Sequence, residues 1–281
     1  MKNTLVLNDW HVGSPFGLQH PNYVNVDGQH IDLSHDSKQD YLYDNFEDKL
    51  ESIRRDHEIH YIQYMGDIID GLPAKGDFTE SALPRIEDQI RCARMLLEEV
   101  RTRFPKAIWN PFVFGTKNHE KPEDTRRLAM DFIRTKCRMT YNMRVVEDGA
   151  DDVLVRFHHE VGFSGAVAGR SGSMEREIVQ GMLAYAEGST ERFDAEVRGH
   201  VHYHARVLQR NIWLVTAPSF QIQNLYGTKP TPNRFPSLGF LVVHTDGRMR
   251  RHGQNPVDFT AYTFNHPKTK ATTPEEENGI S

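Results

Sequence analysis

Short apolar runs and amphipathic stretches alternate along the first two-thirds of the chain. Leu5–Leu7 is an apolar run with no polar face, which is typical of a strand buried on both sides. About residues 38–56 carry apolar side chains at helical spacing after a capping serine, Ser37, so we expect a helix there. A second apolar run follows at 59–65. The order strand, helix, strand predicts a parallel pair joined by a right-handed crossover.

The same alternation continues further along the chain. We expect further helices at about 84–104, 122–135 and 173–187, and further strands at about 108–114, 143–147, 153–157 and 195–198. The last third is mostly strand, at about 205–208, 212–216, 238–244 and a last pair within 248–264. Asp246-Gly247 is a hairpin turn signal. This order predicts an α/β fold in one domain, residues 1–265, and the polar residues 266–281 predict a flexible tail.

Composition places the chain among soluble globular proteins. It is 38% hydrophobic and 26% charged, and no apolar run approaches the roughly 18 residues of a membrane span. The first strand begins without a signal-peptide hydrophobic region, and two distant cysteines, Cys92 and Cys137, favour free thiols in a reducing compartment. We therefore expect a cytoplasmic protein with no membrane partner. The net charge of −5 gives no basic signature for nucleic acid, but bound metal ions can supply positive charge at a phosphate.

Residues typical of metal ligands follow five of the predicted strands. They are Asp9 and His11; Asp67 and Asp70; Asn118 and His119; His158 and His159; and His200 and His202. Because side chains alternate along an extended strand, we expect Asp9 and His11 to point the same way. Strand ends of an open α/β sheet gather along one edge, so residues distant in sequence can converge there. The mixture of carboxylate, amide and imidazole suits Mn, Fe, Zn or Ni, and the set is about right for two ions, an arrangement used for displacement at phosphorus.

This order of motifs resembles the calcineurin-like metallophosphoesterase superfamily. The signatures of that family are Asp-x-His, Gly-Asp-x-x-Asp, Gly-Asn-His-Asp/Glu, a lone His after a strand, and Gly-His-x-His, and the match spans residues 5 to about 204. The resemblance implies a four-layer α/β/β/α sandwich of two mixed sheets flanked by helices. The first motif, Asp-Trp-His-Val-Gly, is similar to the repair-nuclease branch. Together with the His-His and Gly-His-Val-His motifs, it also resembles phosphoesterases common in bacteriophage genomes.

The resemblance also implies a role for each candidate residue. It assigns Asp9, His11 and His202 to the first divalent ion, Asn118, His158 and His200 to the second, and Asp67 to a bridge between them. Manganese is the expected metal, with iron, zinc or nickel as alternatives. A hydroxide between the ions would attack phosphorus. His119 would protonate the leaving oxygen, and Asp70 would orient the ring of His119.

Two departures from the family pattern leave alternatives open. Thr116 and Lys117 stand between the glycine and Asn118, so Thr116 is a second candidate for the ligand position, although we prefer Asn118. The fourth motif is a pair of histidines, and adjacent strand residues face opposite ways, so only one of them should bind metal. We prefer His158, the first after the apolar run, and expect His159 either to contact substrate or to support the ligands from behind them.

The sequence thus predicts a dinuclear-metal-dependent phosphoesterase that hydrolyses a phosphodiester, in a nucleic acid or a nucleotide. A phosphomonoesterase is the first alternative, but the phosphoprotein phosphatase branch has an arginine where this chain has Gly71. A non-catalytic binding scaffold on the same fold is the second, but scaffold members lose ligands that this chain keeps. Arg170, in a glycine-rich segment, is a candidate cation for a substrate phosphate, and a flexible connection is the alternative role of that segment.

Overall fold

Two five-stranded sheets form the centre of the molecule. The computed structural model describes residues 1–30, 37–72, 81–133, 136–147, 149–160, 170–222 and 236–266. The first sheet has the strand order β10 (Val257–Phe264), β9 (Leu238–Thr245), β1 (Lys2–Leu7), β2 (Tyr61–Tyr64) and β3 (Ile108–Trp109). The second has the order β4 (Thr140–Val145), β5 (Val153–His158), β6 (Ala195–Arg198), β8 (Ile212–Thr216) and β7 (Ala205–Gln209). Both sheets are mixed, with parallel pairs at β1–β2, β2–β3, β5–β6 and β6–β8.

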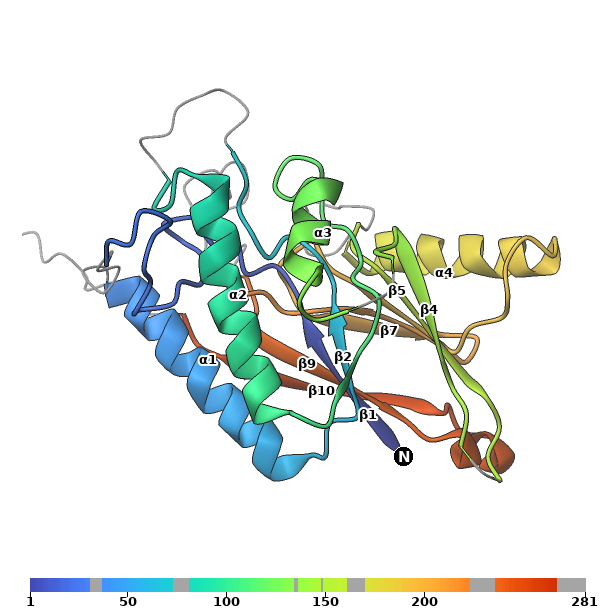
Figure 1. Cartoon of the computed structure of the whole chain (residues 1–281). Helices are drawn as coiled ribbons and strands as arrows, with labels where there is room; N and C mark the ends of the chain where they lie inside the picture. The colour runs from blue at the N-terminus through green and yellow to red at the C-terminus, as the bar shows by residue number, and fades with distance from the viewer. Residues whose placement is uncertain are drawn as a thin grey trace, which may run out of the picture.

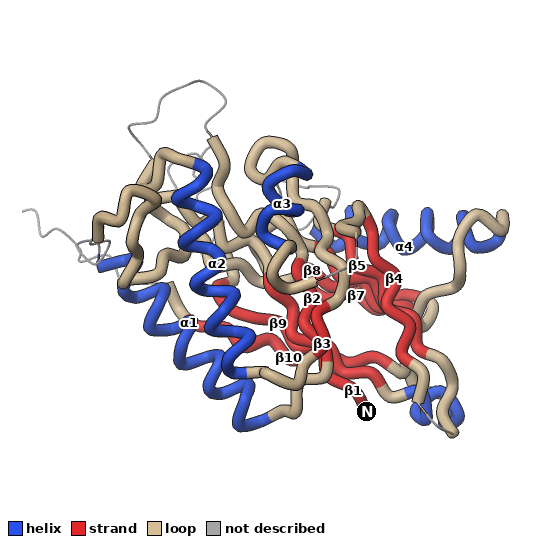
Figure 2. Tube along the Cα trace, in the orientation of Figure 1, coloured by secondary structure: helices blue, strands red, loops and turns tan. Residues whose placement is uncertain are grey.

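The sheets lie between two layers of helices, as Figures 1 and 2 show. The helices are α1 (Ser37–Asp56), α2 (Ile86–Arg103), α3 (Pro122–Ala129) and α4 (Arg170–Ala186). Along β1, Leu5 and Leu7 pack in the same core cluster as α1 and α2, whereas Val6 packs in the cluster shared by the two sheets. On the far side, Leu154 of β5 packs with Met174 of α4. The layers are therefore α/β/β/α, as expected.

The elements expected from periodicity are largely present. The apolar face of α1 consists of side chains at spacings of four, four and three residues, all fully buried: Leu42, Phe46, Leu50 and Ile53. Strands β6 and β8 have the expected bounds, and β1 pairs with β2 in parallel. None of the described helices combines the length and the apolar character needed to cross a membrane.

Two expectations about strands were wrong. The expected strand 108–114 is cut to two residues, and Pro111, which has no N–H to donate, stands just beyond it. In place of a strand pair within 248–264, a 3-10 helix, η4 (Gly247–His252), is followed by the single strand β10. Asp246 begins η4 rather than a hairpin turn, because its side chain accepts a hydrogen bond from the N–H of Arg248 (3.1 Å). The tail expected at residues 266–281 lies outside the described residues from residue 267 onward.

Candidate metal centre

Apart from His158, the last residue of β5, the candidate metal ligands and His119 lie in loops that follow β1, β2, β3, β5 and β6. Five of the seven non-glycine residues with a positive φ in the described part of the chain belong to this set: Asp9 (50°), His11 (48°), Asp67 (49°), His200 (69°) and His202 (56°). Such backbone conformations are uncommon for residues other than glycine, and they concentrate at functional sites. Local strain therefore marks the same place that the motifs mark.

Asp9 and His11 converge for a different reason from the expected one. Strand β1 ends at Leu7, so side-chain alternation along an extended strand does not apply to these two residues. Their loop is held against the loop after β2, since the N–H of His11 donates to the carbonyl of Asp67 (3.1 Å) and the N–H of Val12 donates to that of Ile68 (2.8 Å). The left-handed backbone then directs both side chains into the site.

Asp9, His11 and His202 form a first group of potential ligands. Asp9 Oδ1 lies 3.7 Å from His11 Nε2 and 3.4 Å from His202 Nε2. The two ring nitrogens are 3.2 Å apart. Nitrogens that share a tetrahedral ion at about 2.1 Å would lie roughly 3.4 Å from each other, so this spacing fits a shared cation.

Asp67, His159 and His200 form a second group beside the first. His159 Nε2 lies 2.9 Å from Asp67 Oδ2, and its Nδ1 donates to the carbonyl of Met65 (2.6 Å). The same Nε2 atom is 3.7 Å from Asp9 Oδ1. Asp9 therefore faces histidines of both groups.

The chemistry of these donors fits a cation. Asp9 Oδ1 is buried and has no hydrogen-bond partner among the described residues, while its other oxygen accepts from Asn8 Nδ2 (2.5 Å) and the N–H of His200 (2.8 Å). A buried carboxylate oxygen without a partner is costly unless an ion or a proton donor meets it. Burial alone would lower the pKa of His11, but hydrogen bonds to Asp70 and Asp9 outweigh burial and raise that pKa to about 10. The carboxylates of the site thus favour positive charge among them.

The structure places His159, rather than His158, beside Asp67. His158 is the last residue of β5 and lies on the opposite face, where Arg198 donates to its Nδ1. Burial, and then the charge of Arg198, lower the pKa of His158 to about 4. The geometry therefore favours His159 as the ligand candidate, one position later than the preferred one.

The loop after β3 brings Thr116, rather than Asn118, to Asp67. The N–H of Thr116 donates to Asp67 Oδ1 (2.7 Å), and its hydroxyl donates to Asp67 Oδ2 (2.9 Å). Asn118 is exposed, and no residue in the described part of the chain forms a hydrogen bond with its side chain. Arg170 is the first residue of α4, but its side chain lies outside the described part of the structure.

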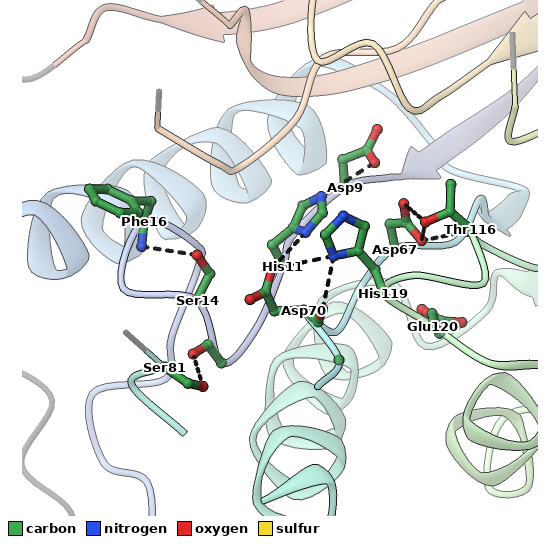
Figure 3. Close-up of polar contacts among 12 residues, drawn as sticks. Asp9, His11, Ser14, Phe16, Asp67, Asp70, Ser81, Thr116, His119 and Glu120 are labelled. Atoms are coloured by element: carbon green, nitrogen blue, oxygen red, sulfur yellow. Dashed lines mark hydrogen bonds and ion pairs between the residues drawn. The ribbon is translucent and has the colours of Figure 1, made fainter. Parts of the chain in front are cut away.

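His119 lies at the rim of the site, and its Nδ1 donates to the backbone carbonyl of Asp70 (2.8 Å; Figure 3). The carboxylate of Asp70 is 3.1 Å from His11 Nδ1 and 3.5 Å from His119 Nδ1. Its closer partner is therefore His11, whereas we expected Asp70 to orient His119. The His119 side chain is 37% exposed and can meet a substrate.

Two further residues support the site: Asn8, which no motif includes, and Glu120, the acidic residue that ends the Gly-Asn-His-Asp/Glu motif. Asn8 holds one oxygen of Asp9, as described above. Glu120 is fully buried and accepts hydrogen bonds from the hydroxyl of Tyr64 (2.6 Å) and the N–H of Ile68 (2.9 Å), which ties its loop to the loop after β2. The sequence feature that could have identified Asn8 is its position as a polar residue directly after the apolar run Leu5–Leu7.

Comparisons with known proteins add the following. No family model matches the chain, and no curated protein matches its sequence. Similar solved structures include vacuolar protein sorting 29 from Cryptosporidium parvum (12% identity, 94% of this chain and 98% of that chain, TM-score 0.44). An archaeal phosphodiesterase (10%, 92% and 99%, 0.41) and a predicted phosphoesterase from Streptococcus pneumoniae (11%, 86% and 82%, 0.33) are also similar. These scores are too low to carry an argument about function, so the function must be argued from the site.

Proposed function

We propose that the protein is a calcineurin-like metallophosphoesterase that uses two divalent ions, with manganese favoured, to hydrolyse a phosphodiester in a nucleic acid or a nucleotide. One observation carries this proposal: Asp9 presents a buried oxygen, which has no hydrogen-bond partner among the described residues, to histidines of two adjoining ligand groups. The order of the five motifs supports the family, and the similarity of the first motif to the repair-nuclease branch supports a diester substrate.

The ligands follow from the two groups. Asp9, His11 and His202 would hold one ion, and Asp67, His159 and His200 the other. We retain Asp67 as the bridging ligand that the resemblance implies; Asp9, which faces both groups, is the alternative. Bound divalent ions would lower the pKa of a water from 15.7 to about 7 and would offset charge on the phosphoryl oxygens.

His119 is the proposed general acid. Because its Nδ1–H donates to the carbonyl of Asp70, the ring is held with Nε2 available to a substrate. To act as an acid, the ring must also carry a proton on Nε2, and the carboxylate of Asp70 lies 3.5 Å from its Nδ1. A protonated His119 can then donate to the leaving oxygen.

Metal analysis followed by a substrate screen tests the proposal. We expect two divalent ions per chain, and faster cleavage of bis(p-nitrophenyl) phosphate and of an oligonucleotide than of p-nitrophenyl phosphate. Asp9→Asn keeps the shape of the side chain but removes its charge, so it should lower both metal content and turnover. Faster cleavage of the monoester would favour a phosphomonoesterase. Two bound ions without turnover of any ester would favour a scaffold.

A further inference from the structure

We propose that the hydroxyl of Thr116 is a ligand of the second metal site, beside Asp67, His159 and His200, and that Asn118 is not. The inference rests on one part of the proposed function, namely that this group holds a divalent ion. It does not depend on which ester the protein cleaves.

The hydroxyl of Thr116 already lies within the second group. Thr116 is buried, with 6% of its surface exposed, and its Oγ1 is 2.9 Å from Asp67 Oδ2 and 3.2 Å from Asp67 Oδ1 (Figure 3). His159 Nε2 is also 2.9 Å from Asp67 Oδ2. The hydroxyl and the imidazole thus flank one carboxylate oxygen, at spacings that donor atoms around a single ion adopt.

The hydroxyl has free lone pairs for an ion. A threonine hydroxyl has one proton and two lone pairs, and here the proton goes to Asp67. Among the described residues, none donates a hydrogen bond to Thr116 Oγ1. A hydroxyl that donates its proton in a hydrogen bond to a carboxylate is polarised. Its oxygen then carries more negative charge and binds a cation more strongly.

The backbone explains why Thr116 holds this place. A Cβ at Gly115 would lie 2.2 Å from Asp67 Oδ1 and 2.4 Å from Asp67 N, so only glycine permits this close approach of the two loops. The residue directly after this glycine is therefore the one that meets Asp67. In the family motif that residue is asparagine, and in this chain it is Thr116.

Lys117 and Asn118 lie in a turn between Thr116 and His119. The carbonyl of Thr116 accepts hydrogen bonds from the N–H of His119 (3.2 Å) and that of Glu120 (2.8 Å), which closes the turn. Both intervening side chains are exposed. The chain returns to the site at His119. His119 therefore keeps the position expected for the general acid, although Asn118 does not reach the position expected for a ligand.

A cysteine at each of the two positions tests direct ligation. The apo forms of Thr116→Cys and Asn118→Cys would be loaded with Co²⁺, and the thiolate-to-cobalt charge-transfer absorption recorded. Wild type, which carries Cys92 and Cys137, is the blank. We expect the band in Thr116→Cys alone. A band in Asn118→Cys, or its absence from Thr116→Cys, overturns the proposal.

Metal affinity supplies a second measurement that does not depend on turnover. Thr116→Val keeps the side-chain shape without the hydroxyl, and Thr116→Ser keeps the hydroxyl. In competition with a chromogenic chelator, we expect Thr116→Val to bind one of the two ions at least about tenfold more weakly. Thr116→Ser and Asn118→Ala should match wild type.

The outcomes separate this inference from the proposed function. Wild-type affinity for both ions in Thr116→Val overturns the inference, even if the wild type cleaves diesters. A loss of affinity in Thr116→Val without a charge-transfer band in Thr116→Cys would also overturn it, because Thr116 would then only hold Asp67 in place. Two ions bound through Thr116 without ester cleavage would contradict the proposed function alone. Equal melting temperatures of the apo variants are the control for folding.

Discussion

His158 and His159 are neighbours in the chain, yet they lie on opposite faces of the second sheet and in opposite electrostatic surroundings. His159 faces Asp67 and Asp9. Burial alone would lower its pKa, but these carboxylates raise it to about 9. His158 faces Arg198 on the side of α4, where burial and then that charge lower its pKa to about 4. The comparison shows that the side to which a histidine points, rather than its residue type, determines whether it can bind a cation.

The outer face has its own charges, and they belong to arginine and glutamate side chains. Arg198 lies 2.8 Å from Glu177 of α4 and 2.7 Å from Glu196 of β6. On the inner face, by contrast, the ion-pair partners of Asp9 among the described residues are all histidines. An arginine supplies the positive charge on the outer face, whereas on the inner face a bound ion can supply it.

The largest expected effect comes from removing each histidine in turn. His159→Ala should lose one of two ions, and diesterase activity should fall by more than the 10–100-fold typical of a residue that only supports a ligand. His158→Ala should keep both ions and most of the activity. Metal analysis and turnover of the two variants measure this, and the reverse result would break the comparison, since the strand would then be out of register by one residue.

His119→Ala should have the next largest effect, and it separates a proton donor from the ligands on the same face. General acid assistance is worth about 10²–10⁴-fold, and it matters most for a poor leaving group. Cleavage of an oligonucleotide should therefore fall far more than cleavage of bis(p-nitrophenyl) phosphate, with both ions still bound. An equal loss on the two diesters would mean that His119 binds substrate or shapes the site.

Asp70→Asn is expected to act mainly through His11. Because the Asp70 carboxylate is closer to His11 Nδ1 than to His119 Nδ1, its loss should weaken metal binding by about 10–100-fold. The same variant should change the preference between leaving groups only slightly, since the backbone carbonyl still holds His119. Unchanged metal affinity together with a strong leaving-group effect would instead support the role expected from the sequence.

Periodicity predicted most of the helices and strands because burial acts on whole faces of an element, whereas the four layers were implied by the family resemblance. The spacing of Leu42, Phe46 and Leu50 is enough to orient α1, and apolar runs are enough to locate β6 and β8. The motifs also pointed to loops that the structure brings together, and these loops follow parallel strands of both sheets.

The details of the site depend on features that periodicity does not carry. Asp9 and Asp67 adopt left-handed backbone, which is uncommon for residues other than glycine and which the spacing of apolar side chains does not predict. The choice between His158 and His159 depends on the residue at which β5 ends, and strand ends are poorly marked in an apolar run. The role of Thr116 depends on the close approach of Gly115 to Asp67, a contact between two loops.

The smallest expected effect comes from the outer face and tests whether the two faces are independent. Glu177→Gln removes one partner of Arg198 but leaves Glu196 in place. Because the Glu177 side chain is 24% exposed, solvent screens the pair, and we expect the free energy of unfolding to fall by about 1 kcal/mol or less. Chemical denaturation measures this, with Glu175→Gln, an exposed neighbour on the same helix, as the matched control.

Metal affinity is the decisive second measurement for Glu177→Gln. Arg198 stands between Glu177 and His158, and His158 is one peptide bond from His159. If charge on the α4 side does not affect the metal centre, the variant binds both ions as wild type does, and only its stability changes. A shift in metal affinity larger than that of Glu175→Gln would show that charge on the α4 side reaches the metal centre through β5. The contrast between the two histidines would then describe one coupled network rather than two separate environments.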